Sequence, residues 1–505
     1  MIGSEPTGLA ETKRLCLIAR EHWAAGRADA ALREAWAAYR VDPAALEAKL
    51  LLVSLAAEFP GRIAPEMRAD LVCLLQDADV APEYMSTAGW VLLLREPWWN
   101  AAANDADCEA LAARLDADAL ALALLRETPV YLRDAERVLT KLRRWLLMSG
   151  QWRHHTNLAD ALIAQATLNG GAWPFGDSER EKLAHDSMPF TAAYLPAAPP
   201  APTPDYADPV TRAVAQGYER WPYPMWRRLM AIETTQRLPD QIRALDPGGP
   251  ECLPVNAKIL IAGCGTGSEA AQIAREYPDA AITAIDLSET SLNYARAQCA
   301  ALGLTRIRFQ KLDLHNISAL NERFDAIFSS GVLHHLPDPE RGWAALAGVL
   351  RAGGVMRIML YSRIARAWVA QERASIRDLA AEPISDDVLR RVRQRFMERQ
   401  DDPLTRQVVN ASAFATLSGT HDLLLHPQED AFDIPRIGRA LQRLKLRLLS
   451  FQLPDVAARA RYDAKFPQDR MHRNLQALAF FERSDPAVFL SQYDFWCRTE
   501  AFWFR

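Results

Sequence analysis

Three glycines and two aspartates lie in the chain at spacings that suit the binding of a nucleotide-like molecule. Gly263, Gly265 and Gly267 follow a short apolar run, and glycine lets a backbone turn sharply and pass close to a ligand. A predicted helix begins directly behind them and points its N-terminal N–H groups at the same place. Asp286 ends a second apolar run nineteen residues after Gly267, and Asp313 ends a third. The carboxylate of Asp286 can accept hydrogen bonds from both hydroxyls of a ribose. The carboxylate of Asp313 suits an adenine amino group.

The residue that follows the glycine loop separates two classes of cofactor. The dinucleotide fingerprint G-x-G-x-x-G requires glycine or alanine at position 268, and Ser268 stands there instead. A nicotinamide-dependent oxidoreductase is therefore disfavoured.

The glycine loop, the two aspartates and residues 324–337 (FDAIFSSGVLHHLP) together resemble the class I methyltransferases that use S-adenosyl-L-methionine (SAM). The resemblance covers residues 210–360 and implies SAM as the cofactor. It implies that the methionine end of SAM lies against the glycine loop, the ribose against Asp286 and the adenine beside Asp313. The residues assigned to the cofactor site in this way are Gly263, Cys264, Gly265, Thr266, Gly267, Asp286, Leu287, Asp313, Leu314 and Ser330.

Four further segments look like recurrent motifs of bacterial methyltransferases that carry an N-terminal tetratricopeptide-like region. They are residues 223–226 (YPMW), 360–362 (LYS), 422–429 (DLLLHPQE) and 492–496 (QYDFW). With them the resemblance extends over most of the chain, and it implies an architecture rather than a particular acceptor.

His334 and His335 are the first candidates for proton transfer. They follow the predicted fourth strand, beside the expected place of the methyl group, and imidazole suits the removal of a proton from an oxygen or nitrogen nucleophile. The alternative is that one of them packs against the cofactor and shapes the loop. Tyr223 is a third candidate, which either caps the cofactor, points its hydroxyl at the acceptor or anchors the packing.

Tyr361, His426 and Glu429 are expected to contact the acceptor substrate. His426 and Glu429 are three residues apart and can share a helical face or a turn. A metal role would need a third ligand, and none stands out in the sequence. We therefore expect no metal, and structural hydrogen bonding is favoured for this pair.

Composition and missing motifs disfavour several classes of partner. Lys and Arg total 59 against 63 Asp and Glu, a net charge of −4, so no nucleic-acid partner is expected. The Asp/Asn-Pro-Pro-Tyr/Phe signature of many exocyclic-amine methyltransferases is replaced by Ser-Ser-Gly-Val at residues 329–332. The seven cysteines form no C-x-x-C pair, no secretory signal is evident, and no apolar run approaches the ~20 residues of a membrane span. These features predict a cytoplasmic protein that does not enter membranes.

Apolar runs that alternate with helical patterns predict a doubly wound α/β (Rossmann-like) sheet. The strands are expected at residues 258–262, 281–285, 306–312, 324–329, 354–361 and 446–453. Ser288 and Asp338 are expected to cap the helices that follow them. Ligands of such sheets bind at the carboxyl ends of the strands, where the candidate residues lie.

The region before this sheet predicts an all-α N-terminal domain over residues 1–194. A turn at Gly26, small residues in the next helix and Pro43 resemble half of a tetratricopeptide repeat, and an irregular bundle is the alternative. Residues 195–209 are proline-rich and predict a stiff linker.

The methyltransferase domain is expected at residues 210–455, followed by a C-terminal helical extension at 456–505. Within it, residues 364–427 are interpreted as a helical insertion that covers the site as a lid. The basic run at residues 390–395 is interpreted as a solvated helix face because acidic residues surround it.

These observations predict methyl transfer from SAM to a protein or peptide acceptor that the helical domain recruits. One alternative is a small-molecule or glycan O- or N-methyltransferase whose helical domain forms a homodimer. The other is a SAM-binding scaffold or regulatory module without catalysis.

Overall fold

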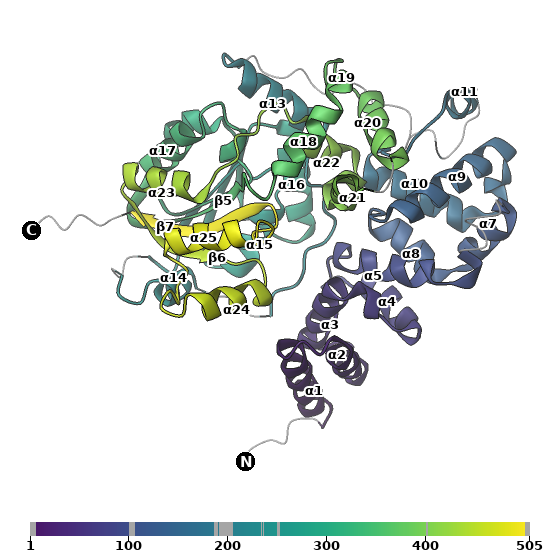
Figure 1. The fold of residues 1–505 in the computed structure, drawn as a ribbon, viewed down its shortest axis with the longest axis horizontal. Helices are drawn as coiled ribbons and strands as arrows, with labels where there is room; N and C mark the ends of the chain where they lie inside the picture. The colour runs from purple at the N-terminus through teal and green to yellow at the C-terminus, as the bar shows by residue number, and fades with distance from the viewer. Residues whose placement is uncertain are drawn as a thin grey trace, which may run out of the picture. The chain divides into compact units, whose positions relative to one another are not determined.

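The computed structural model describes residues 7–99, 107–185, 190, 206–233, 235, 237–249, 253–399 and 402–499. The chain divides into two compact units. The helical unit comprises Met1–Pro199, Arg227–Glu233 and Ile376–Leu423, and the sheet unit comprises Pro200–Trp226, Thr234–Ser375 and Leu424–Arg505. Figure 1 labels helices of both units and the strands β5, β6 and β7.

The sheet unit is built on one seven-stranded sheet (Figure 1). Its strands are β1 (Lys258–Ala262), β2 (Ala281–Asp286), β3 (Arg308–Lys311), β4 (Phe324–Ser330), β5 (Leu350–Tyr361), β6 (Leu446–Gln452) and β7 (Gln492–Thr499). The order across the sheet is β3-β2-β1-β4-β5-β7-β6. Strands β1 to β5 are parallel, and β7 is antiparallel to both of its neighbours. The predicted doubly wound α/β fold is confirmed.

Helices connect and cover these strands. They are α13 (Pro209–Arg220), α14 (Leu238–Leu245), α15 (Ser268–Glu276), α16 (Glu289–Ala301), α17 (Pro339–Val349), α18 (Ala367–Ser375), α23 (Ile434–Arg443), α24 (Val456–Lys465) and α25 (Leu475–Ser484), with short turns η4 (Leu314–Leu320) and η5 (Leu333–His335). In β1 only Lys258 is exposed, because a parallel sheet is covered on both faces. The predicted caps are present: the Ser291 N–H donates to the Ser288 side chain, and the Arg341 N–H donates to Asp338.

The order of the strands places the loops after β1, β2 and β4 next to one another. Ala262 of β1 pairs with Ile285 of β2, and Ile261 pairs with Phe328 of β4. The strand order reverses between β1 and β4, which is where doubly wound sheets bind their ligands. The predicted cofactor residues therefore share one edge of the sheet.

The C-terminal region differs from the predicted helical extension at 456–505. It contains α24 and α25, but residues Gln492–Thr499 form β7, which lies between β5 and β6 in the sheet. Tyr493 and Phe495 alternate with Asp494 along this strand and are completely buried, in the same apolar cluster as Phe451. The residues that follow, Trp496, Cys497 and Arg498, are buried as well, so β7 is covered on both faces and the extension is an integral part of the sheet.

The helical unit consists of successive helices around its own apolar core. In the first part of the chain they are α1 (Thr7–Ala24), α2 (Ala28–Val41), α3 (Leu46–Glu58), η1 (Pro60–Arg62), η2 (Pro65–Met67), α4 (Arg68–Gln76), α5 (Glu83–Leu94), α7 (Cys108–Ala117), α8 (Ala119–Glu127), α9 (Arg133–Ser149), η3 (Gln151–Arg153), α10 (Thr156–Asn169) and α11 (Asp177–His185). Gly26 makes the turn before α2 with φ +70°, and Ala31, Ala35 and Ala38 are fully buried. These features agree with close helix packing, while the assignment to a tetratricopeptide repeat stays a prediction.

The predicted insertion is divided between the two units. Its helix α18 belongs to the sheet unit, whereas residues Ile376–Leu423 belong to the helical unit. This second part contains α19 (Arg377–Ala380), α20 (Asp386–Glu398), α21 (Pro403–Asn410), η6 (Ser412–Ala415) and α22 (Leu417–Thr420), and the π-helix His421–Leu425 contains the boundary. Most of this segment therefore has a structural role within the helical unit, and its function as a lid stays a prediction.

The basic run in α20 shows what that role is. Arg393 is completely buried and donates two hydrogen bonds to Glu136 of α9, at 2.7 and 2.6 Å. Arg390 is also buried and donates to the Gly171 carbonyl at 2.8 Å. The interpretation as a solvated helix face is therefore wrong for these two arginines and right for Arg391, which is exposed and pairs with Glu382. The buried face joins α20 to the N-terminal helices.

Two other sequence predictions have limited structural information. Most of the predicted linker at 195–209 lies outside the described residues, and its last part begins α13, where Asp208 accepts a hydrogen bond from the Thr211 N–H. Among the described residues, none of the helices combines the length and the apolar character that crossing a membrane requires.

Candidate functional site

The glycine loop after β1 has a backbone that only glycine allows. Gly263 and Gly267 adopt φ values of +76° and +86°. A Cβ atom on Gly263 would lie 2.3 Å from Cγ2 of Val332, and one on Gly267 would lie 2.5 Å from Cβ of Ala295. The loop is thus packed closely between the segment after β4 and helix α16, which explains the glycines at these two positions.

The segment before α14 fixes the loop from another side. The Thr266 hydroxyl donates to the Pro224 carbonyl, and the Trp226 indole N–H donates to the Thr266 carbonyl at 2.9 Å. Tyr223 lies at the same place, because a Cβ on Gly265 would be 3.2 Å from its carbonyl oxygen. The structure therefore brings the backbone of this candidate residue to the cofactor loop.

Asp286 at the end of β2 is bonded to the glycine loop. The Gly265 N–H donates to its Oδ2 at 2.7 Å, and the Ser288 N–H donates to its Oδ1 at 2.9 Å. Burial raises the pKa of Asp286, and the two N–H donors act in the opposite direction. A carboxylate offers about four lone-pair sites, so both oxygens retain capacity to accept hydroxyl hydrogens.

Asp313 follows β3 and is held by the first turn of η4. The His315 N–H donates to Oδ1 of Asp313 at 2.9 Å, and the His315 ring lies 3.3 Å from the same atom. Burial raises the pKa of Asp313, but the contacts with His315 outweigh it and leave the pKa below its ordinary value. Leu314 beside it is buried and Leu287 after Asp286 is half-buried, so that apolar side chains accompany both acids.

Glu219, which the sequence did not single out, supports this edge of the sheet from α13. Its buried carboxylate accepts hydrogen bonds from the Glu289 N–H at 2.8 Å, the Thr290 N–H at 2.9 Å and Nζ of Lys311 at 3.1 Å. Burial by itself raises the pKa of a carboxyl, yet these donors lower the pKa of Glu219 to about 2. The Ser288 hydroxyl also lies 3.3 Å from it, so Glu219 holds the residues that follow Asp286.

The residues at this edge fit the adenosyl group of SAM. The glycine loop forms a cradle that side chains would fill, Asp286 offers oxygens for the ribose hydroxyls, and Asp313 with Leu287 and Leu314 suits a flat base with an amino group. Ser330 at the end of β4 points in the same region, and its hydroxyl donates to Oε1 of Glu269 in α15 at 2.6 Å. These acceptors and apolar side chains suit a nucleoside. The contacts of individual residues with the cofactor stay predictions.

His334 and Tyr361 form a stacked pair at the ends of β4 and β5. Their ring centroids are 3.8 Å apart, and the Tyr361 N–H donates to Nδ1 of His334 at 3.2 Å. The ring proton of neutral His334 is therefore on Nε2, which has no hydrogen-bond partner among the described residues. Burial, and then the neighbours His335, Arg366 and His426, lower the pKa of His334 well below its ordinary value. His334 is a neutral N–H donor.

His335 has the opposite tautomer. Its Nδ1 lies 2.8 Å from the Gln428 carbonyl, which can only accept, so that Nδ1 carries the proton and Nε2 carries the lone pair of the neutral ring. His426 stacks on it with ring centroids 3.7 Å apart and accepts from the Gln428 N–H at 3.1 Å. Of the two adjacent histidines, His335 is the one whose neutral ring has its lone pair on Nε2, and its role as a general base stays a prediction.

Glu429 lies in the same cluster and holds two arginines. Arg366 donates to both of its oxygens at 2.9 and 2.8 Å, and Arg373 donates at 2.8 Å. Burial raises the pKa of Glu429, but the arginines outweigh it and lower the pKa below its ordinary value. The Arg366 guanidinium lies 3.7 Å from the centre of the Tyr361 ring. His426 and Glu429 therefore make the structural hydrogen bonds that the sequence favours for this pair.

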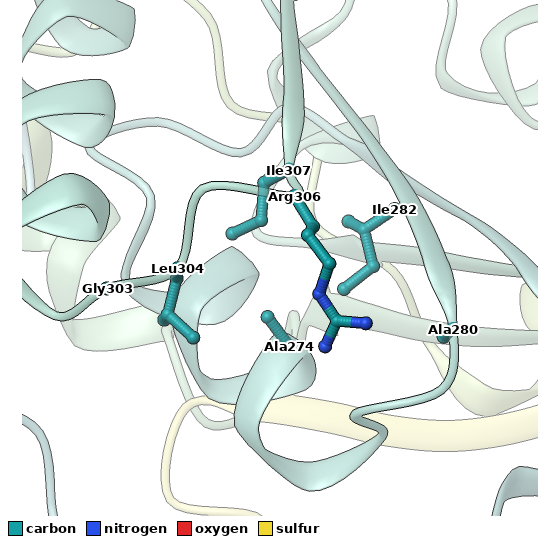
Figure 2. A pocket seen from close by; sticks show the side chains of 7 residues that line it. All are labelled: Ala274, Ala280, Ile282, Gly303, Leu304, Arg306 and Ile307. Atoms are coloured by element: carbon teal, nitrogen blue, oxygen red, sulfur yellow. The ribbon is translucent and has the colours of Figure 1, made fainter.

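The structure thus brings five predicted residues into one cluster, namely His334, His335, Tyr361, His426 and Glu429. A separate small depression lies at the other end of the strands (Figure 2). It is lined by Ala274, Ala280, Ile282, Gly303, Leu304, Arg306 and Ile307, around the starts of β2 and β3. No predicted site residue lines it.

Comparison with known proteins agrees with this site. Residues 259–354 match the family model described as methyltransferase domain. An uncharacterized protein of Synechococcus sp. is 33% identical over 239 residues, which cover 45% of this chain and 55% of that protein. The trans-aconitate 2-methyltransferase of Deinococcus radiodurans is 36% identical over 104 residues, 21% of this chain and 38% of that enzyme. The ubiquinone biosynthesis O-methyltransferase of Pectobacterium atrosepticum is 30% identical over 112 residues, 22% and 46% of the two chains.

These relatives are matched over part of their length. The chain spans 38–55% of the length of the three curated proteins. Among solved structures, PKMT2 from Rickettsia typhi in complex with AdoHcy covers 53% of each chain with 13% identity and a TM-score of 0.39, too low to support a functional argument. The family match, the strand order and the glycine loop with its two acids identify residues 259–354 as a SAM-dependent methyltransferase domain of class I.

Proposed function

We propose that the protein transfers the methyl group of SAM to a protein or peptide acceptor that the helical unit recruits. The observation that carries the proposal is the hydrogen bond from the Gly265 N–H to Asp286. It joins the glycine loop and the predicted ribose-binding carboxylate into one site. The SAM sulfonium supplies an electrophilic methyl group. The protein has to align the acceptor, exclude water and take up a proton.

The two adjacent histidines would have different roles toward the acceptor. His335, with its lone pair on Nε2, would take the proton of the nucleophile. His334 stays neutral and presents an N–H group, which would donate to an acceptor oxygen or hold the loop. The stack of Tyr361 on His334 and the ion pair of Glu429 with Arg366 keep these rings in place.

The extent of the helical unit supports a macromolecular acceptor. That unit contains Met1–Pro199 and Ile376–Leu423, and the buried pair Arg393–Glu136 makes both parts one body. A helical body of this size exceeds what the binding of a small metabolite requires.

A small-molecule acceptor is the second candidate function. Two of the curated relatives are named for small molecules, trans-aconitate and ubiquinone. Methyl transfer to such a compound would use the same cofactor site and the same histidines. In that case the helical unit would serve another purpose, such as dimerisation.

Two measurements test these proposals on the full chain. Calorimetry with SAM, S-adenosylhomocysteine and NAD should show binding of the first two alone, and binding of NAD alone would overturn the proposal. A cell extract from a strain that lacks the protein is then incubated with the protein and tritiated-methyl SAM and separated into protein, lipid and small-molecule pools. Label in the protein pool supports the first candidate, and label in the small-molecule pool the second. SAM binding without label in any pool would indicate a scaffold.

A further inference from the structure

Glu269 places a carboxylate beside the glycine loop that the proposed mechanism has not used. It lies in the first turn of α15, two residues after Gly267. The Ser330 hydroxyl donates to its Oε1 at 2.6 Å, so the start of α15 and the end of β4 are joined through this side chain. This is the part of the loop that faces the methionine end of SAM in the arrangement proposed above.

The carboxylate of Glu269 has no ion-pair partner among the described residues. Among the described residues, no Lys, Arg or His forms an ion pair with it, and Ser330 provides its hydrogen bond. The charged groups that influence it are Arg357 and Asp494. These two bind each other through two hydrogen bonds, at 3.0 and 2.5 Å, so the Arg357 charge is already compensated.

Glu269 is half-buried, and a partly desolvated carboxylate is stabilised when a positive group pairs with it. Burial raises the pKa of Glu269, and the Ser330 hydroxyl and Arg357 oppose this effect. A neutral hydroxyl donor compensates only part of the free energy lost when a carboxylate leaves water. The arrangement therefore suits a ligand that brings its own cation with N–H donors.

SAM carries two positive groups, and only one of them can donate hydrogen bonds. The sulfonium has no N–H or O–H, whereas the α-ammonium of its methionine part is a strong donor to carboxylates. On this basis we propose that Glu269 binds the α-ammonium group of the cofactor, with Ser330 positioning the carboxylate. The inference rests on the proposed SAM-dependent function and names a contact that the sequence motifs did not assign.

The experiment is a cycle of two ligands and two proteins, read by calorimetry and without any acceptor. The ligands are S-adenosylhomocysteine and its analogue that lacks the α-amino group, and the proteins are the wild type and Glu269→Gln. A charge-assisted hydrogen bond predicts that the wild type binds the deaminated analogue about 10- to 100-fold more weakly. Glu269→Gln should weaken S-adenosylhomocysteine binding by a similar factor and bind the two ligands about equally.

A third ligand separates the possible failures. 5′-Methylthioadenosine has no amino-acid part, and its affinity should be unchanged in Glu269→Gln, which also shows that the variant is folded. Equal losses for all three ligands, or wild-type affinities that do not distinguish S-adenosylhomocysteine from the deaminated analogue, would overturn the inference. A wild-type protein that binds none of the adenosyl compounds would instead refute the proposed function.

Two further variants complete the design. Glu269→Asp keeps the charge and should recover part of the affinity for S-adenosylhomocysteine. The matched control is Glu289→Gln in the first turn of α16, because this glutamate is paired with Arg296 at 2.7 Å and should leave all three affinities unchanged. If Glu269→Gln does not fold, Glu269→Asp takes its place in the cycle, and a wild type that does not distinguish the two ligands still overturns the inference.

Discussion

The backbone N–H of Gly265 donates to Oδ2 of Asp286 at 2.7 Å, so the loop after β1 and the end of β2 hold each other in position. The second oxygen of Asp286 accepts from Ser288, at the start of the next helix. One carboxylate therefore shapes the cradle, and its remaining lone pairs are the predicted acceptors for the ribose hydroxyls.

Replacement of Asp286 should weaken the cofactor site in both ways. In Asp286→Asn the side-chain NH2 would face the N–H of Gly265 or of Ser288, and neither can accept a hydrogen bond. The negative charge that is predicted to bind the ribose hydroxyls would also be lost. We expect a loss of SAM affinity of about 100-fold, the value of two hydrogen bonds to a charged group. Calorimetry measures it, with Asp279→Asn at an exposed turn as the control. Unchanged affinity would show that the ribose assignment is wrong.

Two glycines with similar backbones separate conformational strain from steric clash. Gly303→Ala, at φ +72° with no atom within 4 Å of the new Cβ, should lower the free energy of unfolding by about 1 kcal/mol. Gly267→Ala, at φ +86° with Ala295 at 2.5 Å, should lower it by about 3 kcal/mol. Urea denaturation gives both values, and SAM binding should be lost in the second variant alone. Equal values would show that Ala295 moves away easily.

Glu219 should stabilise the sheet unit in a pH-dependent manner. Its pKa of about 2 in the folded protein lies below the ordinary value of 4.5, so its contribution is present above pH 4.5 and is lost as the pH falls toward 2. At pH 7 we expect Glu219→Gln to lower the free energy of unfolding by about 3 kcal/mol. SAM binding should also weaken, because the residues after Asp286 lose their support.

The control for this variant is Glu322→Gln, whose partly exposed side chain pairs with Arg308. It should cost about 0–1 kcal/mol. The difference between wild type and Glu219→Gln, measured by urea denaturation, should shrink as the pH is lowered below 4.5. A difference that is constant with pH would mean that the carboxylate charge is not what stabilises α16.

His334 should make the protein less stable in mild acid. Its pKa in the folded protein is lowered by burial, so below the ordinary value of 6.5 the unfolded chain takes up a proton that the folded one does not. Stability should fall as the pH is lowered below that value, by at most about 1.4 kcal/mol per pH unit. His334→Asn keeps an acceptor for the Tyr361 N–H and should show a shallower dependence between pH 7 and 5. Parallel curves would contradict a buried neutral imidazole.

His335 should matter for turnover rather than for cofactor binding. With the acceptor identified by methyl labelling, His335→Ala should lower kcat by about 10²- to 10⁴-fold, the usual contribution of a general base. The affinity for SAM should change by less than about twofold, since the ring contacts Gln428, His426 and Tyr361. An unchanged rate would show that His335 only packs against its neighbours. The control is His154→Ala at an exposed position.

The sequence was sufficient for those elements that follow a local pattern. β1 was predicted at its observed bounds, and both predicted caps are present, because short apolar runs and capping side chains act over a few residues. β7 was missed because its buried residues form a short run without a clear period of two. The pattern does not show that residues 492–499 insert beside a strand that lies more than a hundred residues earlier.

The arginines of α20 were missed for a similar reason. Arg390 and Arg393 are three residues apart on one face, together with buried Val392 and Phe396, whereas Arg391 faces solvent. Composition alone does not separate the two faces of a helix. The partner Glu136 is distant in the sequence, so the buried pair has no local signal.

Of the two glutamates at the cofactor site, one could have been noticed. Glu219 lies in the last turn of α13, where a negative charge opposes the helix dipole, and such a position suggests a specific partner. Glu269 is in the first turn of α15, where acidic residues are favourable in any helix. Its importance depends on the contact with Ser330, which only the folded sheet brings about.

The position of β7 also affects the order in which the sheet can be completed during translation. β6 has β7 as its strand neighbour, and it is synthesised about forty residues before β7. The first five strands can pair as they leave the ribosome, while β6 has no strand partner until β7 emerges, and its backbone groups are bonded to water until then. The nascent chain therefore carries an incomplete sheet edge until a late stage, and that edge is where we would look for chaperone binding.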